Sequence, residues 1–548
     1  MEYAVGWLNL LFGRGDDDHP YWLLAVRLNV LLFLACAALV LAWHLRPRRL
    51  RAAPDRLGEI AVLLGLTGLA AWLRWGIASA NLLDLGGIPY SRLLLGYQGY
   101  FGSAQLYSPW YELTARQIEQ GIRLNRLAGT LTVPLVYLTC RALAPRQPLL
   151  AALAALLIAV SPLHILFSAS DALAIASGFL AAASYALLAG GAARRQHPRA
   201  TRLHWLGGFA GLALLTQVRY ENLLFLLPVA AWLLARRRAL AWPALRTALA
   251  PAALLVAAYA VAAAGASVSY RARFDVARGL DLLLHHLVLN PFTAIPLLLA
   301  GTLAIGVYRG LARGALALLP WVMAGGLVVL TTDSGHSAAR IFANWLVVLL
   351  PLAAWGFALM LGGRRPARRL AAVALLVLAV QPWLLRAQLG ARHLEMAEHE
   401  WFTGLLAALP PGTAALVVPD DELLRRQAGS TLEVMHKYAM IRAAQPGAAA
   451  LPRLIGITEY LEHPERSGCA PGTCLFVGGL PCLEQEVYPF THVQCAALLR
   501  QRRTTALDAL DVVAAPFVPC AVYAGAAWQD FCAPATEARR LALYRLDD

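Results

Sequence analysis

The sequence predicts an all-α polytopic membrane protein that carries a small C-terminal α/β domain. The 548-residue chain is 59% hydrophobic and only 14% charged, whereas about a quarter of the residues in ordinary soluble domains are charged. Apolar runs long enough to cross a bilayer as a helix, about 20 residues, recur between residues 21 and 387. Because a chain in lipid must satisfy its backbone hydrogen bonds internally, these runs are predicted to be helices.

About 12 transmembrane helices are expected, several of them short and rich in glycine and alanine. The predicted spans are 21–44, 58–78, 127–143, 149–161, 172–190, 206–217, 221–235, 246–266, 291–308, 314–331, 341–361 and 370–387. They divide the chain into three parts. Residues 1–57 form an extra N-terminal span with a basic loop, residues 58–387 form the main membrane domain, and residues 388–548 form the C-terminal domain.

The net charge of +15 comes from arginines in alternate short loops, and this distribution argues against a nucleic-acid binder. These arginines cluster at 46–56, 141–146, 194–202, 236–238, 309–313 and 364–369. Short loops rich in Lys and Arg stay cytoplasmic. The N-terminus, the 79–126 loop and the 388–548 region are therefore predicted to lie outside. The expected location is a bacterial inner membrane, with the C-terminal domain in the periplasm.

Cysteine usage supports the same side for the C-terminal domain. Six of the eight cysteines fall in the last eighty or so residues: Cys469, Cys474, Cys482, Cys495, Cys520 and Cys532. Six cysteines in a small extracytoplasmic domain predict three disulfides, whose pairing the sequence leaves open. A zinc site is the alternative, although no C-x-x-C pair occurs. Cys36 and Cys140 lie in apolar spans and are expected to be buried.

In the C-terminal region, the predicted helices and strands follow one another in the order expected of an α/β domain. A helix is predicted over 395–409 and is followed by a buried strand over 414–418. Further strands are predicted at 475–478, 511–513 and 541–546.

Polar and ionisable residues gather in the loops predicted to be outside. Ionisable groups near membrane depth are costly and by default mark functional sites. The longest such segment runs from Ala80 to Gln120 and contains Asp84, and the others are 161–171, 217–221 and 331–340. All four could line one cavity.

The order of several motifs along the chain resembles that of the GT-C glycosyltransferases that use polyprenyl-phosphate sugars. The protein mannosyltransferase-like branch, which includes the aminoarabinose transferases of lipid A, is the most similar. The resemblance covers roughly residues 58–360 and rests on Arg74, Tyr107-Ser-Pro-Trp110, the run from Arg126 to Tyr137, Ser161 through Asp171, Gly207 to Thr216, and Arg340. The chain departs from the family in having one acid at Asp84 where the family has an Asp-Glu pair, and in the extra span 21–44.

The resemblance implies a GT-C-like fold and transfer of a sugar from a polyprenyl-phosphate donor to a hydroxyl or amine of a lipid, glycan or protein. Such a reaction needs a carboxylate that deprotonates the acceptor. Asp84 is the predicted base, with a helix cap or an ion pair with Arg92 as the alternative. Asp171 is the second catalytic candidate, with an N-terminal acid of the span 172–190 as the alternative.

Cations must hold the lipid phosphate, and aromatic rings can stack on sugar faces. The candidate substrate-binding residues are Arg74, Tyr90, Arg92, Tyr107, Glu112, Arg126, His164, Arg219 and Arg340. For Arg219 and Arg340 the alternative is that their side chains reach toward the membrane interface. His164 and His336 could join Asp84 or Asp333 around a divalent metal, but no cofactor is expected.

Two other classes of protein fit parts of the pattern. A secondary transporter would show related halves and broken helices that meet at the bilayer midplane. A non-catalytic assembly or sensor protein would need only the membrane anchor and the outer domain.

Overall fold

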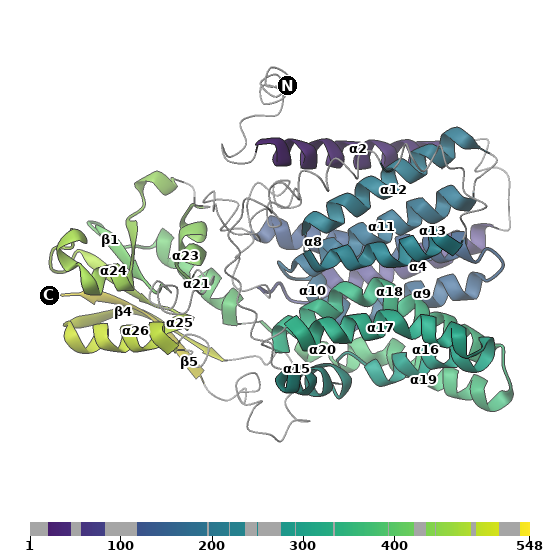
Figure 1. Cartoon of the computed structure of the whole chain (residues 1–548). Helices are drawn as coiled ribbons and strands as arrows, with labels where there is room; N and C mark the ends of the chain where they lie inside the picture. The colour runs from purple at the N-terminus through teal and green to yellow at the C-terminus, as the bar shows by residue number, and fades with distance from the viewer. Residues whose placement is uncertain are drawn as a thin grey trace, which may run out of the picture.

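The computed structural model consists of a bundle of long helices and a smaller α/β domain beside one end of it (Figure 1). It describes residues 20–44, 56–82, 118–193, 197–218, 220–235, 249, 276–290, 292–331, 335–392, 394–420, 434–443, 445, 447–483, 489–513 and 538–547.

The helical bundle follows the predicted spans closely. Its elements are α2 (Pro20–His44), α4 (Arg56–Trp72) with the π-helix η1 (Leu73–Ile77), α8 (Ile118–Leu143), α9 (Pro148–Val160), α10 (Pro162–Ser168), α11 (Leu173–Ala193), α12 (Pro198–Val218), η2 (Tyr220–Phe225), α13 (Leu226–Ala235), α15 (Val276–Leu282), η4 (Leu283–Val288), α16 (Ile295–Arg309), α17 (Leu311–Thr331), α18 (Gly335–Leu361), α19 (Arg365–Leu384) and α20 (Arg386–Leu389). The predicted span 246–266 lies outside the described residues except for residue 249.

Five helices among the described residues are long and apolar enough to cross a membrane, and the number rises to six if the bent pair α9 and α10 counts as one span. Several of these helices turn large apolar side chains outward. Leu64 on α4, Leu316 on α17 and Leu370 on α19 are 67%, 70% and 63% exposed. Such surfaces are stable in lipid rather than in water. The expectation of about twelve spans stays a prediction.

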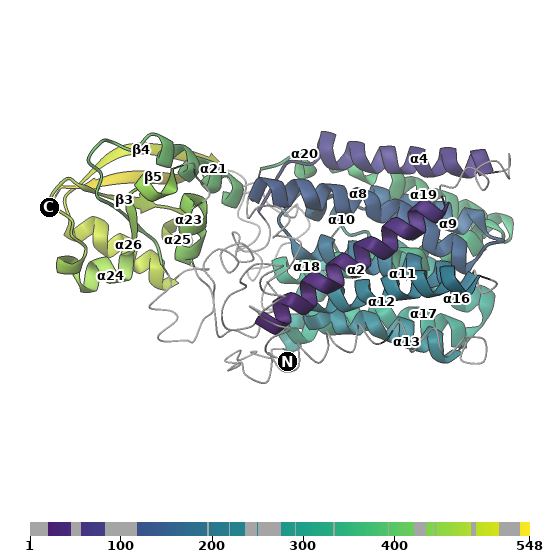
Figure 2. The same ribbon diagram turned by 90° about the horizontal axis from the view of Figure 1, so that it is seen from above.

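The interior of the bundle is built around α11, and 83% of its most apolar stretch is buried. It packs against α8 on one side and α12 on the other, and α2 crosses over α12 (Figure 2). Gly211 of α12 makes this approach close, because a Cβ there would lie 2.3 Å from Ser184 Oγ on α11 and 2.9 Å from Phe33 on α2. Small residues at helix contacts serve the same purpose in membranes generally.

The basic turns lie at the end of the bundle opposite to the α/β domain. The turns that join α8 to α9, α16 to α17, and α18 to α19 sit at the far end in Figure 1. Arg141 pairs there with Glu59 at the start of α4, at 2.6 Å. We call the end that faces the α/β domain the domain-side end. Loops at this end are those that the arginine pattern predicts to be outside.

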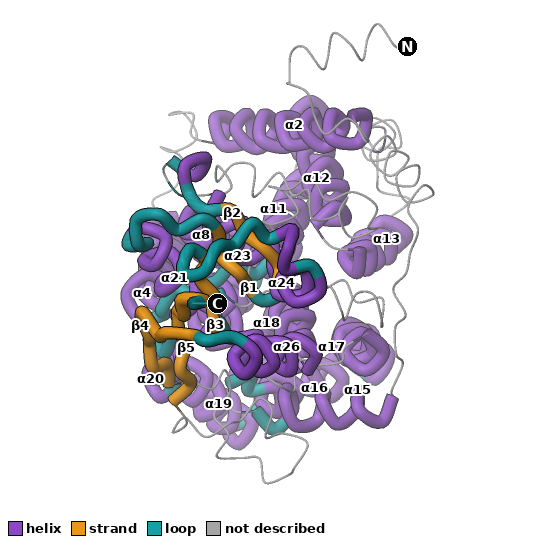
Figure 3. The backbone as a smooth tube through the Cα atoms, turned by 90° about the vertical axis from the view of Figure 1, so that its left-hand side faces the viewer, coloured by secondary structure: helices purple, strands orange, loops and turns teal. Residues whose placement is uncertain are grey.

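The α/β domain contains one five-stranded sheet in the order β2-β1-β3-β5-β4. Figure 3 shows the strands of the sheet in orange. The strands β1, β2 and β3 are parallel, whereas β5 is antiparallel to both β3 and β4. The elements are α21 (Leu394–Ala407), β1 (Ala415–Val418), α23 (Val434–Ala443), η5 (Ala448–Ala450), β2 (Arg453–Gly456), α24 (Ile457–Glu462), η6 (Pro464–Arg466), β3 (Cys474–Gly478), α25 (Leu480–Leu483), α26 (Pro489–Gln501), β4 (Thr504–Val513) and β5 (Ala538–Leu546).

Both faces of this sheet are covered by helices, which explains why β1 is apolar at every position. Leu416 and Val418 face a core completed by α21 and α23. Ala415 and Val417 face the other core, beneath α24 and α26. Parallel strands covered on both faces characteristically read as continuous apolar runs. The predicted helix 395–409 and strands 414–418, 475–478 and 541–546 are confirmed, and 511–513 is the end of the longer strand β4.

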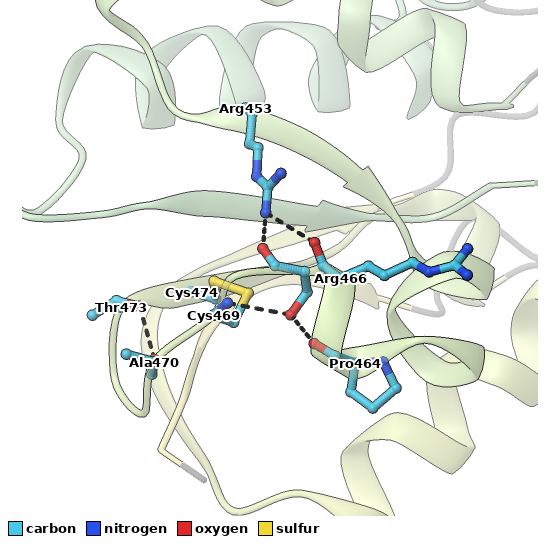
Figure 4. Close-up of a disulfide and its surroundings, with 8 residues drawn as sticks. Arg453, Pro464, Arg466, Cys469, Ala470, Thr473 and Cys474 are labelled. Carbon is cyan, nitrogen blue, oxygen red and sulfur yellow. Dashed lines mark hydrogen bonds between the residues drawn. A yellow bond between two sulfur atoms is a disulfide. The ribbon is translucent and has the colours of Figure 1, made fainter.

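Two disulfides stabilise this domain. Cys469, in the turn before β3, pairs with Cys474, the first residue of β3, and Cys482 in α25 pairs with Cys495 in α26. Arg453 of β2 donates to the backbone oxygens of Arg466 and Ser467 beside the first disulfide (Figure 4). Cys520 and Cys532 lie outside the described residues. Within those residues the cysteines follow the disulfide prediction rather than the zinc alternative.

A buried ion cluster joins α21 to α23. Lys437 contacts the carboxylates of Glu395 and Glu398, and Glu398 also accepts hydrogen bonds from Tyr438 Oη at 2.7 Å and Leu480 N at 2.8 Å. Burial alone would lower the pKa of Lys437, but the two carboxylates more than offset it and hold the pKa above its ordinary value. The stabilisation from this raised pKa is therefore present at neutral pH and is lost only as the pH rises through the raised value.

We predict that Lys437→Ala destabilises the protein by about 3–5 kcal/mol, because it leaves the buried carboxylate of Glu398 and the partly buried carboxylate of Glu395 without their cation. The measurement is the thermal unfolding midpoint of the detergent-solubilised full-length chain, compared with Arg500→Ala. Arg500 is an exposed cation on α26, so its replacement should leave the midpoint unchanged. Equal midpoints for the two variants would contradict the role assigned to the cluster.

Candidate active site

A break between two helices defines the domain-side end of the bundle. Helix α9 ends at Val160, and α10 continues from Pro162 at an angle of 57°. Ser161 lies at the break, and its hydroxyl accepts a hydrogen bond from His164 N at 3.4 Å. Proline at the first position of α10 suits a helix start, because its missing N–H would have no partner there. The chain then enters the turn 169–172 that carries Asp171.

Arg74, in η1, holds this break together from inside the bundle. Its side chain is fully buried. Its guanidinium donates to the backbone oxygens of Ile158 at 3.1 Å and Ala159 at 3.2 Å. The last carbonyls of a helix have no partner within the helix, and a cation is favoured at that end. Arg74 therefore completes the end of α9.

The remaining donors of Arg74 reach three other acceptors. These are Ala70 O at 3.0 Å, Ser168 Oγ at 3.2 Å and His164 Nδ1 at 2.7 Å. An arginine has five N–H donors, and all five are taken here by the protein. Arg74 has no donor left for a phosphate in this arrangement, and its geometry favours a structural role over the substrate-binding role that the sequence predicts.

His164 and Ser168 belong to the same buried cluster. Because Arg74 donates to His164 Nδ1, that nitrogen acts as an acceptor, so the imidazole is neutral in this contact. Ser168 also donates to His164 O at 2.6 Å. Gly129 of α8 leaves room for the cluster, since a Cβ there would lie 2.1 Å from Ser168 Oγ and 3.1 Å from Arg74 Nε. His164 is thus engaged inside the protein rather than exposed at the interface.

Asp171, a predicted catalytic residue, lies fully buried in the turn between α10 and α11. Asn125 of α8 donates from its Nδ2 to Ser170 O at 2.8 Å and to Ala172 O at 3.2 Å, the carbonyls on either side of Asp171. Ser170 Oγ accepts from Ala172 N at 3.2 Å. The backbone of the Asp171 turn is therefore fixed from two directions.

The segment that leads toward Asp84 meets the same turn. Asn81 is fully buried, its N donates to Ala169 O at 3.0 Å, and it forms an isolated parallel bridge with Ser170. The chain after α19 lies against this segment, because Ser79 N donates to Leu389 O at 3.0 Å and Asn81 Nδ2 donates to Ala391 O at 3.1 Å. Three distant stretches of sequence thus meet in one junction.

Arg126 lies on α8 directly after Asn125 and is half-buried. Its Nη2 donates to Ala78 O at 2.9 Å, and its guanidinium lies 5.5 Å from the ring centroid of Trp75. Within the described residues its buried Nε has no hydrogen-bond partner. Unlike Arg74, Arg126 thus retains a donor for a further acceptor.

Arg340 lies near the start of α18, one helical turn before Asn344. Asn344 donates to Asn222 Oδ1 at 2.7 Å, and Asn222 donates to Ser177 Oγ and Leu215 O, both at 2.9 Å. This is a second buried polar network, formed by α11, α12, η2 and α18. Neither Arg340 nor Asp171 is among the partners of Arg74.

The other predicted site residues lie outside the described residues. They are Asp84, Tyr90, Arg92, Tyr107, Glu112 and Arg219. The side chains of Asp333 and His336 are also outside them. Among the residues that the structure describes, no group of three His, Cys, Asp or Glu side chains is arranged to hold a metal ion.

The structure adds four residues that sequence reasoning did not single out as site residues, namely Asn81, Asn125, Asn222 and Asn344. All four are almost completely buried. The sequence did contain a signal for these four asparagines, because asparagine is rare inside apolar spans unless its amide is hydrogen-bonded. What the sequence lacked was their partners, which are mostly backbone oxygens far away in the chain.

Comparison with known proteins gives matches in structure only, since no family model and no curated sequence matches the chain. ArnT from Cupriavidus metallidurans in the apo state is similar with a TM-score of 0.49 and 12% identity, over 89% of this chain and 98% of that chain. The structure of ArnT bound to undecaprenyl phosphate has a TM-score of 0.47 and 13% identity, over 90% and 98%.

The oligosaccharyltransferase AglB from Archaeoglobus fulgidus, in complex with an inhibitory peptide and a dolichol-phosphate, has a TM-score of 0.44 and 13% identity, over 65% of this chain and 58% of that chain. ArnT and AglB are both GT-C glycosyltransferases, the group that the sequence is predicted to resemble. At such identities and TM-scores the likeness does not place the chain in a family or assign it an activity.

We predict that Arg74→Lys destabilises the protein by about 3–5 kcal/mol, because an ammonium with three donors cannot replace five hydrogen bonds in a buried site. The matched control is Arg123→Lys, since Arg123 is exposed on α8. Thermal unfolding of the two purified variants tests the prediction. A wild-type midpoint for Arg74→Lys would show that the guanidinium cluster is not what holds the break between α9 and α10.

Proposed function

We propose that this chain is a membrane glycosyltransferase that moves a sugar from a polyprenyl-phosphate donor to a hydroxyl or amine acceptor at the domain-side end of the bundle. The acceptor is a lipid, glycan or protein at the periplasmic face of a bacterial inner membrane. The predicted resemblance to GT-C enzymes motivates the reaction class.

The observation that carries the proposal is the buried acid Asp171 in a turn that is held by buried amides, at the domain-side end of an apolar helical bundle. A buried carboxylate is costly and persists where the surrounding structure supports it. Asp84 follows Asn81 by three residues in the sequence but lies outside the described residues, and its proposed role rests on the sequence.

The proposed reaction replaces one bond at the anomeric carbon of the sugar. The acceptor oxygen or nitrogen attacks this carbon and forms the new glycosidic bond, while the bond from the carbon to the phosphate oxygen breaks. The acceptor proton passes to the carboxylate that acts as general base, which we assign to Asp84 or Asp171. The polyprenyl phosphate leaves with the bonding electron pair, and cations stabilise its negative charge.

Arg126 is the best-supported candidate among the described residues for that electrostatic role. It lies near the domain-side end of α8 and keeps a buried N–H group for an acceptor. Trp75, beside it, is 47% exposed, and Trp72 and Trp383, whose ring centroids are 5.9 Å apart, are 50% and 41% exposed. Tryptophans gather at the level of lipid headgroups, where the phosphate of a lipid-linked sugar lies. Arg92, Arg219 and Arg340 remain proposed phosphate ligands.

We predict that at least one of Asp171→Asn and Asp84→Asn lowers transfer at least about 100-fold, because general-base catalysis typically contributes that much or more. The assay follows radiolabelled sugar from a panel of polyprenyl-phosphate sugars to an envelope-lipid, glycan or peptide acceptor, with the purified chain in liposomes. The matched control is Asp281→Asn, which removes an acid that pairs with His285 on α15 and should leave the rate unchanged.

Full activity in both Asp171→Asn and Asp84→Asn would refute the assignment of the base. If the wild-type chain transferred no sugar from any donor of the panel, the proposed activity itself would be wrong.

A further inference from the structure

The turn that carries Asp171 receives unusual support from two asparagines. Asn125 uses both N–H groups of its amide, one on Ser170 O and one on Ala172 O. The two acceptors flank Asp171 in the sequence, so a single side chain fixes the peptide groups on both sides of the acid. Asn125 is fully buried, and therefore both carbonyls depend on its amide rather than on solvent.

Asn81, in the segment that follows η1, supports the same turn. Its backbone N donates to Ala169 O at 3.0 Å, two residues before Asp171. Its side-chain amide donates to Ala391 O at 3.1 Å, in the segment that connects α20 with α21 of the α/β domain. Ser79 adds hydrogen bonds to Leu389 O and Gly390 O, the second at 2.6 Å from its hydroxyl.

The α/β domain is attached to the bundle near this junction. His399 of α21 is hydrogen-bonded through Nε2 to Glu119 Oε1 at 2.9 Å. Glu119 lies in the first turn of α8, the helix that carries Asn125. The connection from the α/β domain to the Asp171 turn thus runs through two routes, the segment 389–391 with Asn81 and helix α8 with Asn125.

We propose that Asn125 and Asn81 are positioning residues for Asp171, and that the segment 389–391 of the connection to the α/β domain is part of this support. This inference rests on the proposed function, because Asp171 acts in catalysis only if the chain is a transferase. A buried amide suits the role since it donates twice without adding charge beside the carboxylate. Asn125→Ala leaves the carbonyls of Ser170 and Ala172 without these two donors, which lets the turn relax. Asn81→Ala keeps the backbone bond to Ala169 O and removes the side-chain bond to Ala391 O, which loosens the segment 389–391 against residues 79–81.

The test compares Asn125→Ala and Asn81→Ala with Thr132→Ala. Thr132 is fully buried on α8 and makes one hydrogen bond to its own helix, to Ala128 O at 2.8 Å, so the control loses a buried bond without touching the turn. Two quantities are measured on the full-length chain in detergent or liposomes. They are kcat and the KM for the donor, and the hydrogen-exchange rates of the amides of residues 170–173.

We expect Asn125→Ala to lower kcat at least about 10-fold while KM for the donor changes less than about 2-fold, because a misplaced carboxylate affects the reacting geometry more than donor binding. Exchange at residues 170–173 should rise at least about 10-fold in Asn125→Ala. Asn81→Ala should change kcat and exchange in the same direction by a smaller factor, since its backbone bond to Ala169 O remains. Thr132→Ala should leave kcat and exchange in the turn unchanged, even where its unfolding midpoint falls. Asn125→Thr, which keeps one donor, should give intermediate values and replaces Asn125→Ala if that variant does not fold.

Wild-type exchange in the turn of the asparagine variants would overturn the inference. A loss of kcat in Thr132→Ala equal to that in Asn125→Ala would overturn it too, since it would show a general structural effect. Should the wild-type chain transfer no sugar, the proposed function fails, and the exchange rates still decide whether the two asparagines hold the turn.

Discussion

The five hydrogen bonds of Arg74 are the interaction on which the domain-side end of the bundle depends. A guanidinium in an apolar interior is stable only when all of its donors are satisfied. Here they complete the carbonyl end of α9 and fix α10 through His164 and Ser168. Because the Asp171 turn follows α10 directly, the position of that acid relative to α8 and α4 depends on Arg74 as well as on Asn125 and Asn81. Gly129 leaves the space that the arrangement needs.

The α/β domain has stabilising features of its own and is joined to the helical bundle by specific contacts. The α/β domain has its own cores, disulfides and buried ion cluster. Its connection to the bundle includes Met396 of α21, which belongs to the apolar core of the bundle. Polar contacts complete the connection, from Ser79 and Asn81 to residues 389–391 and from His399 to Glu119. Directional hydrogen bonds of this kind define one relative placement at the end where the proposed reaction occurs.

The sequence predicted the helices, the α/β tail and its main strands well, because apolar periodicity and arginine-rich turns are local signals. It also selected Arg74, His164, Arg126 and Asp171, but it could not assign their roles. The charge of Arg74 and its position in the sequence suggest that it binds a phosphate. Its five acceptors in the structure lie up to ninety-four residues away in the chain, so the sequence does not reveal them. The partners of Asn81 and Asn125 are backbone oxygens, which leave no trace in residue identity. Asp84, Tyr90, Arg92, Tyr107, Glu112 and Arg219 remain sequence predictions because they lie outside the described residues.

The central claim is that a lipid-linked phosphate reacts at the domain-side end, beside Arg126 and the Asp171 turn. Photo-crosslinking with a polyprenyl phosphate that carries a diazirine in its first isoprene unit tests this most directly. The account predicts that mass spectrometry will locate the adducts at the domain-side ends of η1, α8 and α19, and that unlabelled polyprenyl phosphate will compete with them while a phospholipid will not. Adducts spread evenly along the apolar faces of the bundle, or concentrated at the opposite basic end, would contradict it.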